Sequence, residues 1–232
     1  MNHRKLTAYG ILLALVFMVS RAMLMAAFSS VSYVIMDTLK DIPRIVVASI
    51  AYCLAVKTYS SDELGLHRRF TWLPFAFLAA EIIIDLAILP SAEKHYTPIW
   101  QIAVLVVNSF VVGFFEEVLF RGLILQSIKK WLGVWPAIFI SSILFMLFHF
   151  QAQRLEHFPS IFLYGMVAAI LRLSGQSLWV LMIIHGVFDS LTPFIEGHVP
   201  DEHLKVYYFY AYGVYAAVAV VIWLLSKKRL ES

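Results

Sequence analysis

Two glutamates and an arginine lie inside one of the most apolar stretches of the chain, GFFEEVLFRG at residues 113–122. Ionisable groups are costly to bury in a bilayer, so they are usually paired or functional. Glu117 and Arg121 are four residues apart, and a helix would place them on one face as an ion pair. Glu116 lies about 100° further round such a helix, so we expect its carboxylate to face another element.

Two later apolar segments carry groups that could meet Glu116. The first contains His149, and the second contains His185 and Asp189, which are four residues apart and would share a helix face. Counted from the expected helix ends at a rise of 1.5 Å per residue, Glu116, His149 and His185 lie roughly 17–24 Å deep. Their similar depth predicts one buried site formed by three helices.

These residue types are suited to amide hydrolysis. A carboxylate and a neutral imidazole can hold and deprotonate a water molecule, and a second histidine can donate a hydrogen bond to the oxyanion that forms when a carbonyl is attacked. Glu116, His149 and His185 are also types that bind a divalent metal, so a metal site stays an alternative. A structural alternative is open as well, in which the histidines only join helices and Glu117 and Arg121 form a structural ion pair.

Other intramembrane protease motifs are missing from the sequence. It contains no HExxH zinc motif, no Gly-x-Ser-Gly and no Gly-x-Gly-Asp. Cys53 is the single cysteine, which excludes an internal disulfide and a redox dithiol. We interpret Cys53 as a core residue.

The composition describes the elements that must position these groups. Of the 232 residues, 61% are hydrophobic and 14% charged, whereas about a quarter of a soluble domain is charged. We therefore expect an all-α fold, a polytopic helical bundle embedded in a lipid bilayer. The net charge of +3 is spread over short loops, which indicates membrane topology rather than a nucleic-acid surface.

About eight apolar segments are long enough to be considered as spans. The expected spans are residues 7–28, 42–57, 72–90, 99–125, 134–150, 158–173, 177–194 and 205–225. An even number places both termini on one side, and most Lys and Arg residues fall on that side, which predicts cytoplasmic termini. The N-terminal apolar run lacks a clear cleavage site, so we interpret it as an uncleaved first span. We expect one transmembrane domain over residues 1–232.

Three motifs together resemble the signature of a known family. Glu-Glu-x-x-x-Arg is formed by Glu116, Glu117 and Arg121, Phe-x-x-x-His by Phe145 and His149, and His-x-x-x-Asn/Asp by His185 and Asp189. This order and spacing resembles the CAAX protease and bacteriocin-processing (CPBP, or Abi) family, which includes the type II CAAX prenyl endopeptidases. ELGLHRR and the block from LYGM to FDSL are similar to further family segments. The resemblance is strongest near residues 110–192 and implies a family core at about 100–194.

The resemblance implies an intramembrane endopeptidase of the glutamate type in the cytoplasmic membrane of a prokaryote. Glu116 would be the general base and His149 would help it to activate water, while His185 and Asp189 would stabilise the oxyanion. Glu117 and Arg121 would balance charge, and Phe145 would pack beside the site. This mechanism requires no cofactor, although many family members are described as metalloproteases.

One residue departs from the family pattern. The prenyl-processing members usually carry Asn where this chain has Asp189, and an ionised carboxylate accepts hydrogen bonds but does not donate them. The departure weakens the expectation of a CAAX substrate more than that of a peptidase. Prenylated CAAX proteins, bacteriocin precursors and signalling peptides stay open as substrates, and the sequence does not determine the oligomeric state.

Two other functions stay open beside proteolysis. One is a non-proteolytic factor on the same scaffold, such as a bacteriocin-immunity or partner-binding membrane protein. The other is a transporter or channel that depends on Glu81 or Asp85, which lie four apart in the third expected span. The family pattern gives these two carboxylates no role, and we expect that they pair with Arg21, line a hydrated opening or lie near the outer interface.

Overall fold

A computed structural model describes residues 2–66, 71–88, 98–151, 155–196 and 201–230, and the regular secondary structure in these ranges is entirely helical. The α-helices are α1 (His3–Ala27), α2 (Tyr33–Thr58), α3 (Leu73–Ile88), α4 (Ile99–Glu116), α5 (Leu125–Leu132), α6 (Val134–Phe148), α7 (Phe158–Leu173), α8 (Leu178–Glu196) and α9 (Asp201–Leu230). A π-helix, η2 (Glu117–Ile124), joins α4 to α5, and two 3₁₀ turns, η3 (His149–Gln151) and η4 (Leu155–His157), lie between α6 and α7.

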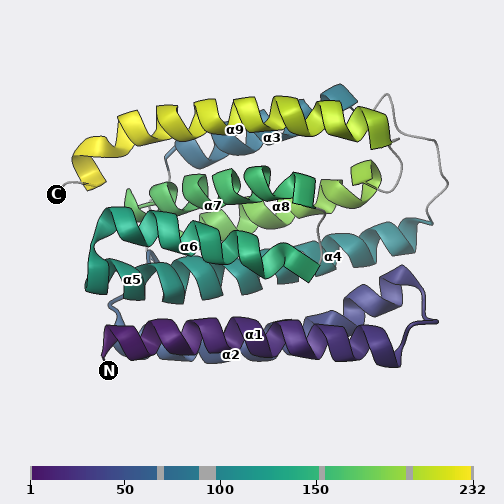
Figure 1. The fold of residues 1–232 in the computed structure, drawn as a ribbon, viewed down its shortest axis with the longest axis horizontal. Helices are drawn as coiled ribbons and strands as arrows, with labels where there is room; N and C mark the ends of the chain where they lie inside the picture. The colour runs from purple at the N-terminus through teal and green to yellow at the C-terminus, as the bar shows by residue number, and fades with distance from the viewer. Residues whose placement is uncertain (1, 67–70, 89–97, 152–154, 197–200, 231–232) are drawn as a thin grey trace.

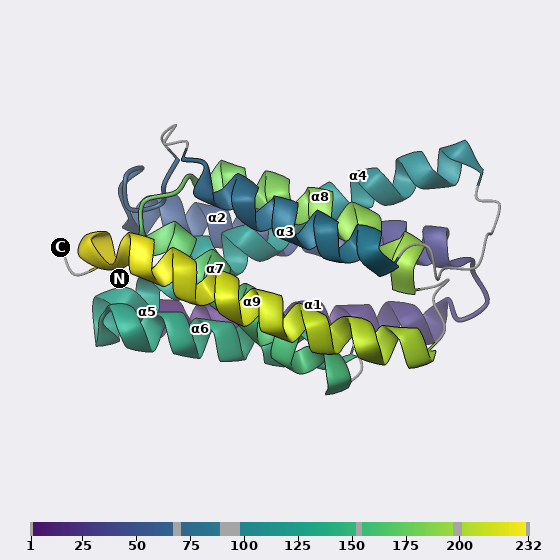
Figure 2. The same cartoon turned by 90° about the horizontal axis from the view of Figure 1, so that it is seen from above.

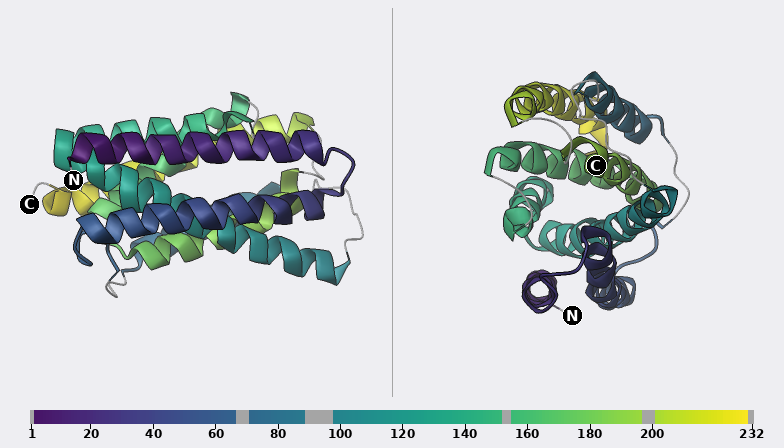
Figure 3. Two further views of the ribbon diagram at one scale, coloured as in Figure 1. Left: turned by 90° about the horizontal axis from the view of Figure 1, so that it is seen from below. Right: turned by 90° about the vertical axis from the view of Figure 1, so that its right-hand side faces the viewer.

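The long helices lie side by side with their axes along the length of the bundle (Figure 1). α1 and α2 form one edge, α3 and α9 form the opposite edge, and α4, α6, α7 and α8 lie between them, as the end-on view in Figure 3 shows. Seen from above, α9 and α3 run over α7 and α8 (Figure 2). α1 begins and α9 ends at the same end of the bundle, so the described helices place the two ends of the chain together.

The helices have the length and composition of membrane spans. Among the described residues, three stretches are long and apolar enough to cross a bilayer: His3–Ala27, Ile99–Leu132 and Val134–Gln151. Shorter apolar helices cover Leu73–Ile83, Leu178–Leu191 and Tyr212–Lys227. Large apolar side chains on the outer faces, including Val19, Ile83 and Val107, are more than half exposed. A lipid environment would cover such a surface without cost.

The sequence prediction for α2 was wrong at its start. The helix begins at Tyr33 rather than at residue 42, and it continues through Pro43. Arg44 pairs with Asp41 at 2.7 Å and with Asp37 at 3.4 Å, and Lys40 lies 3.7 Å from Asp37. Because these charges neutralise one another on one helix face, they lie inside the helix instead of ending it.

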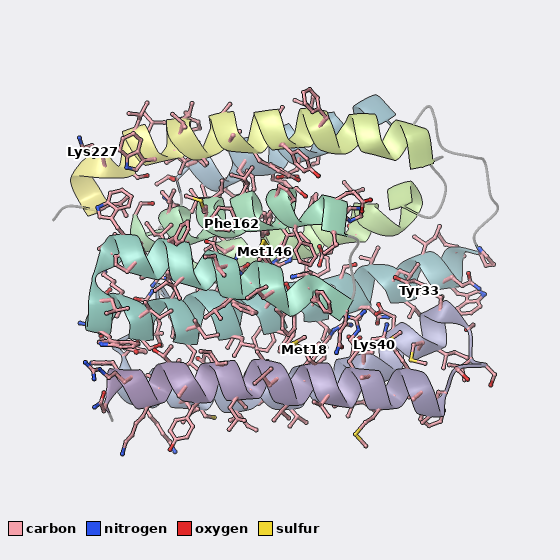
Figure 4. The ribbon with its side chains drawn as sticks, in the orientation of Figure 1. Met18, Tyr33, Lys40, Met146, Phe162 and Lys227 are labelled. Atoms are coloured by element: carbon pink, nitrogen blue, oxygen red, sulfur yellow. The ribbon has the colours of Figure 1, made fainter. Side chains whose placement is uncertain are left out.

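The position of this network can be followed in Figure 4. Lys40 lies between α1 and α4, toward the end of the bundle opposite to Lys227. The side-chain amide of Asn108 of α4 and the hydroxyl of Thr38 form a hydrogen bond at 3.3 Å. Polar groups thus join α2 to α4. Arg68, Arg69, Lys94 and Arg154, which the topology prediction also used, lie outside the described residues.

α4 and α8 approach closely because glycines face each other. A Cβ atom built on Gly113 would lie 2.7 Å from the carbonyl oxygen of Met182 and 2.8 Å from the amide nitrogen of Gly186. One built on Gly186 would lie 2.7 Å from the ring of Phe110. Small residues allow such backbone contact between apolar helices. The contact fixes the distance between the helices that carry Glu116 and His185.

The connection from α2 to α3 docks on the turn between α7 and α8. Gly65 has φ +62°, and its carbonyl accepts a hydrogen bond from Leu178 N at 2.9 Å. The buried guanidinium of Arg172 donates to the carbonyls of Glu63 and Gln176, the latter at 3.1 Å. Glu63 also pairs with Lys130 at 2.5 Å. The contacts of Glu63 and Gly65, at the start of the ELGLHRR segment, therefore hold this connection against the other helices. We call these contacts the clamp.

Candidate active site

The two glutamates lie where α4 changes into the π-helix η2. The amide of Glu117 donates to the carbonyls of both Gly113 and Phe114, and all eight residues of η2 are buried. The sequence prediction assumed ordinary α-helical geometry here, which was wrong. A π-helix takes up an extra residue and is often found at functional sites. The wider turn lets Glu116 and Glu117 both reach the same histidine from adjacent positions.

Glu116 lies between two imidazoles. Its Oε2 is 3.6 Å from His149 Nε2 and 3.7 Å from His185 Nε2. Both distances exceed those of direct hydrogen bonds, and Oε2 is a buried oxygen without a hydrogen-bond partner among the described residues. The carboxylate and the two ring nitrogens thus converge on one small space.

His149 ends α6 with its ring held in one orientation. Its Nδ1 lies 2.8 Å from the carbonyl oxygen of Phe145, one turn earlier. A carbonyl only accepts hydrogen bonds, so Nδ1 carries the proton of the neutral ring. Nε2, which faces Glu116, is then the basic nitrogen.

His185 is surrounded by three carboxylates. Its Nδ1 lies 2.9 Å from Glu117 Oε1, and its Nε2 lies 3.5 Å from Asp189 Oδ2 as well as 3.7 Å from Glu116 Oε2. Nδ1 donates to Glu117, since a carboxylate only accepts. The nearby negative charges favour the imidazolium form of this ring. The carboxylate of Asp189 thus contacts His185 one helical turn away.

Arg121 is held by one carboxylate and by aromatic faces. Its Nε lies 3.4 Å from Glu117 Oε2, whereas its buried Nη1 and Nη2 have no hydrogen-bond partner among the described residues. The guanidinium carbon lies 4.1 Å from the Phe145 ring centroid and 6.0 Å from that of Tyr164. Such cation–π contacts compensate part of the lost solvation.

Tyr164 is a residue of this site that the sequence prediction missed. Its ring centroid lies 5.1 Å from that of His185 and 6.0 Å from that of Phe145, with which it stacks. Tyr164 lies in the block from LYGM to FDSL, which gave it no role. A tyrosine next to a glycine in an apolar helix carries no sequence signal that separates it from ordinary packing.

The structure brings all seven residues of the predicted site together: Glu116, Glu117, Arg121, Phe145, His149, His185 and Asp189. Exposure of the side chains rises across them, from 0% for Glu117 through 7% for Glu116 and 17% for His149 to 25% for Asp189. The site is therefore closed on the Glu117 side and open toward Asp189.

The sequence prediction offers Glu116, His149 and His185 as candidate metal ligands. Within the described ranges, no group of three or more His, Cys, Asp or Glu side chains is arranged to hold a metal ion. These three side chains therefore do not form a preformed metal site there.

Glu81 of α3 contacts α9. Glu81 is buried, and its carboxylate accepts a hydrogen bond from the Tyr215 hydroxyl of α9. Tyr215 packs on Phe77, which in turn packs on Tyr164. The side chain of Asp85 lies outside the described residues.

Comparisons with known proteins agree with this site. Residues 98–191 match a family model described as type II CAAX prenyl endopeptidase Rce1-like, and that range contains all seven residues of the site. No curated protein matches the chain. Over this range the chain is similar to the type II CAAX prenyl endopeptidases.

Proposed function

We propose that the protein is an intramembrane endopeptidase that hydrolyses a peptide bond with a water molecule activated by Glu116 and His149. The observation that carries the proposal is the buried Glu116 Oε2, which has no hydrogen-bond partner in the described residues and lies 3.6 and 3.7 Å from two imidazole nitrogens. These separations are too long for direct hydrogen bonds and suit a water molecule that bridges the groups.

Water activation follows from the acceptors at this position. Glu116 Oε2 and the unprotonated Nε2 of His149 each accept a hydrogen bond from the water. Its oxygen lone pair is then directed away from both and toward a substrate carbonyl. Glu116 takes the proton as the carbon–oxygen bond forms, because its Oε2 lies beside the water and has no other hydrogen-bond partner among the described residues.

His185 stabilises the oxyanion. In the imidazolium form, Nδ1–H donates to Glu117 and Nε2–H is free to donate to the oxygen of the attacked carbonyl. Asp189, at 3.5 Å from Nε2, favours this form and limits the ring's rotation. An ionised Asp189 cannot donate to the oxyanion, so His185 carries this role.

The tetrahedral intermediate then collapses with the atoms in balance. The carbon–nitrogen bond breaks, and Glu116 returns its proton to the leaving amine. One product ends in a carboxylate and the other in an amine. Arg121 and Glu117 keep the same charges throughout, which holds the field at His185 constant.

We propose that the substrate is a membrane-associated peptide, with prenylated CAAX-type ends and small secreted precursors as the two classes to test. The protein would act in the cytoplasmic membrane of a prokaryote with both termini in the cytoplasm. We also propose that no resident metal is required. Activity that survives dialysis against a chelator is the expected result, and activity restored only by an added divalent ion would contradict it.

The test compares new peptide termini, by quantitative mass spectrometry, in host cells that carry wild-type protein or Glu116→Gln at equal expression. Glu63→Gln is the control, because it removes a carboxylate far from the site. Termini that vanish only with Glu116→Gln support proteolysis and name the substrate. Identical termini in all three strains, with any knockout phenotype still rescued by Glu116→Gln, would instead favour the immunity or partner-binding function.

A further inference from the structure

α1 is fixed against the candidate active site by one aromatic side chain. The ring of Phe17 lies 4.7 Å from that of Phe115 and 5.6 Å from that of Phe148. These two rings directly precede Glu116 and His149 in the chain. Phe17 is 3% exposed, so this face of α1 is packed against the residues that flank the proposed base.

Arg21 follows Phe17 by four residues, and a helix places the two on the same face. Its guanidinium interacts electrostatically with Glu116 of α4 and with Asp37 of α2. Arg44 comes to the same place from α2, with its guanidinium carbon 6.0 Å from the Phe17 ring centroid. Two cations of different helices therefore stand beside the base.

These two arginines differ in how their charge is neutralised. Arg44 pairs with Asp37 and Asp41, and Lys40 also pairs with Asp37. The four side chains of this α2 network carry no net charge. Arg21 forms no ion pair with any described residue, and its buried Nε has no hydrogen-bond partner there. Arg21 is thus a half-buried cation without an ion-pair partner among the described residues.

We propose that Arg21 is a binding residue for a carboxylate of the peptide substrate, on the α1 side of Glu116. The proposal rests on the proposed function, because it uses Glu116 to mark where the peptide lies. A guanidinium presents parallel N–H donors that match a carboxylate. The adjacent acids Asp37 and Asp41 are already paired, so an incoming carboxylate would meet a free cation. The carboxylate could belong to the C-terminus of a peptide or to an Asp or Glu side chain.

The experiment measures binding rather than cleavage, with full-length protein in detergent micelles and isothermal titration calorimetry. The probes are N-acetyl-Leu-Leu-Leu as the free acid, the same peptide as its amide, and N-acetyl-Leu-Asp-Leu as its amide. The proteins are wild type, Arg21→Gln, Arg21→Lys and Arg4→Gln. Arg4→Gln is the matched control, since it removes the same group from the other end of α1.

Wild-type protein is expected to bind at least one carboxylate peptide roughly 10-fold to 100-fold more tightly than the neutral amide, as for a hydrogen-bonded charge. Arg21→Gln should remove this preference, Arg21→Lys should keep part of it, and Arg4→Gln should leave it unchanged. A preference for the free acid identifies the C-terminus as the group bound, and a preference for the aspartate peptide identifies an acidic side chain.

Three results would overturn the proposal: equal or unmeasurable binding of acid and amide by wild type, a preference that survives Arg21→Gln, and a preference that Arg4→Gln also removes. An unfolding temperature of Arg21→Lys equal to that of wild type would show that this variant is folded. Proteolysis is scored separately by the termini experiment. A wild type that binds the acid but cleaves nothing therefore contradicts the proposed function and leaves the carboxylate site standing.

Discussion

The guanidinium carbon of Arg121 lies 4.1 Å from the centroid of the Phe145 ring. Arg121 Nε forms an ion pair with Glu117, whereas Nη1 and Nη2 are buried and have no hydrogen-bond partner in the described part of the chain. The face of the Phe145 ring therefore compensates part of the solvation that the guanidinium loses on burial. Phe145 is part of how the site tolerates a buried charge, in addition to filling space.

Replacing Phe145 with leucine should cost more stability than its volume explains. A desolvated cation–π contact contributes about 2 kcal/mol, so we expect Phe145→Leu to lower the free energy of unfolding by about 2 kcal/mol or more. Phe162→Leu is the matched control, because Phe162 packs edge-on against Phe139 and takes part in no cation–π contact with another described residue. Denaturant unfolding in micelles measures both. Equal losses in the two variants would show that Arg121 does not depend on the ring.

Removing the carboxylate of Glu117 should destabilise the protein more than removing the carboxylate of Glu116. Glu117→Gln leaves Arg121 as a buried cation without an anion, which costs about 3–5 kcal/mol. Glu116 pairs with no arginine of the described ranges at ion-pair distance, so Glu116→Gln should change stability by less than about 1 kcal/mol while abolishing cleavage. Melting temperatures in detergent compare the two.

The double variant Glu117→Gln with Arg121→Met provides the control for this prediction. It removes both charges, and replacing a whole buried pair by neutral groups is often close to neutral. We expect it to be more stable than Glu117→Gln alone. A double variant that is less stable than the single one would mean that the pair itself, rather than the uncompensated charge, determines stability.

A methyl group on Gly113 should separate α4 from α8. Its Cβ would lie 2.7 Å from the Met182 carbonyl oxygen, a backbone atom that cannot rotate away. Overpacking of this kind costs about 1–3 kcal/mol. A shift of about 1 Å in a catalytic group can cost about 100-fold in rate. We expect Gly113→Ala to lower both stability and turnover, because Glu116 and His185 lie on the two separated helices.

Gly213→Ala tests whether that effect comes from the close contact. A Cβ on Gly213 of α9 would have no atom of the described residues within 4 Å apart from its own neighbouring helical turn. Alanine is favoured over glycine inside a helix by roughly 0.5–1 kcal/mol, so this variant should be neutral or slightly more stable. Similar losses in the two variants would contradict the proposed role of the α4–α8 contact.

The clamp at Glu63 should weaken in acid. The Lys130 ammonium and the Ser60 amide hold the pKa of Glu63 at about 2, below its ordinary value of 4.5. A lowered pKa in the folded state adds stability that is complete above about pH 4.5 and is lost as the pH falls toward 2. Because Glu63 is one-third exposed, the contribution is about 0.2–1 kcal/mol.

Unfolding of wild type and Glu63→Gln between pH 2 and 7 measures this contribution. Their difference in free energy should be constant above about pH 5 and should shrink below pH 4.5. Lys130→Met removes the other partner and should flatten the same pH dependence. A difference that grows as the pH falls would have the wrong sign for a lowered pKa.

Much of the fold could be predicted because its cause is local. Long apolar runs can satisfy their backbone groups in a membrane only as helices or barrels, and each of the eight expected segments overlaps a described helix. The spacing of the three motifs identified the seven candidate site residues from the sequence alone. Residues four apart share a face whatever surrounds them, as His185 and Asp189 do.

What could not be predicted depends on contacts between segments. Arg44 lies at the start of the expected span 42–57, whereas its partners Asp37 and Asp41 lie before that start. The apolar pattern therefore did not show that ion pairs place all three on one helix face. Tyr164 gave no signal because its role comes from the rings and the cation of other helices. The change to π-geometry at Glu117 follows from packing around an apolar sequence that is equally compatible with an α-helix.

The π-helix η2 determines how α4 and α5 are rotated relative to each other about their common axis. Residues Ile99–Leu132 form one continuous helical element, and a π-turn holds about one residue more than an α-turn. If one residue were removed from Glu117–Ile124, the remainder could close as an α-helix, and the two ends of this element would keep nearly the same relative rotation, because a π-turn and an α-turn each complete one full turn. Gly113 would still face α8 and Lys130 would still face Glu63. If all the residues were kept but wound as an α-helix, the extra residue would instead rotate the two ends by about 100° relative to each other. The π-turn therefore takes up one additional residue without changing the orientation of either end.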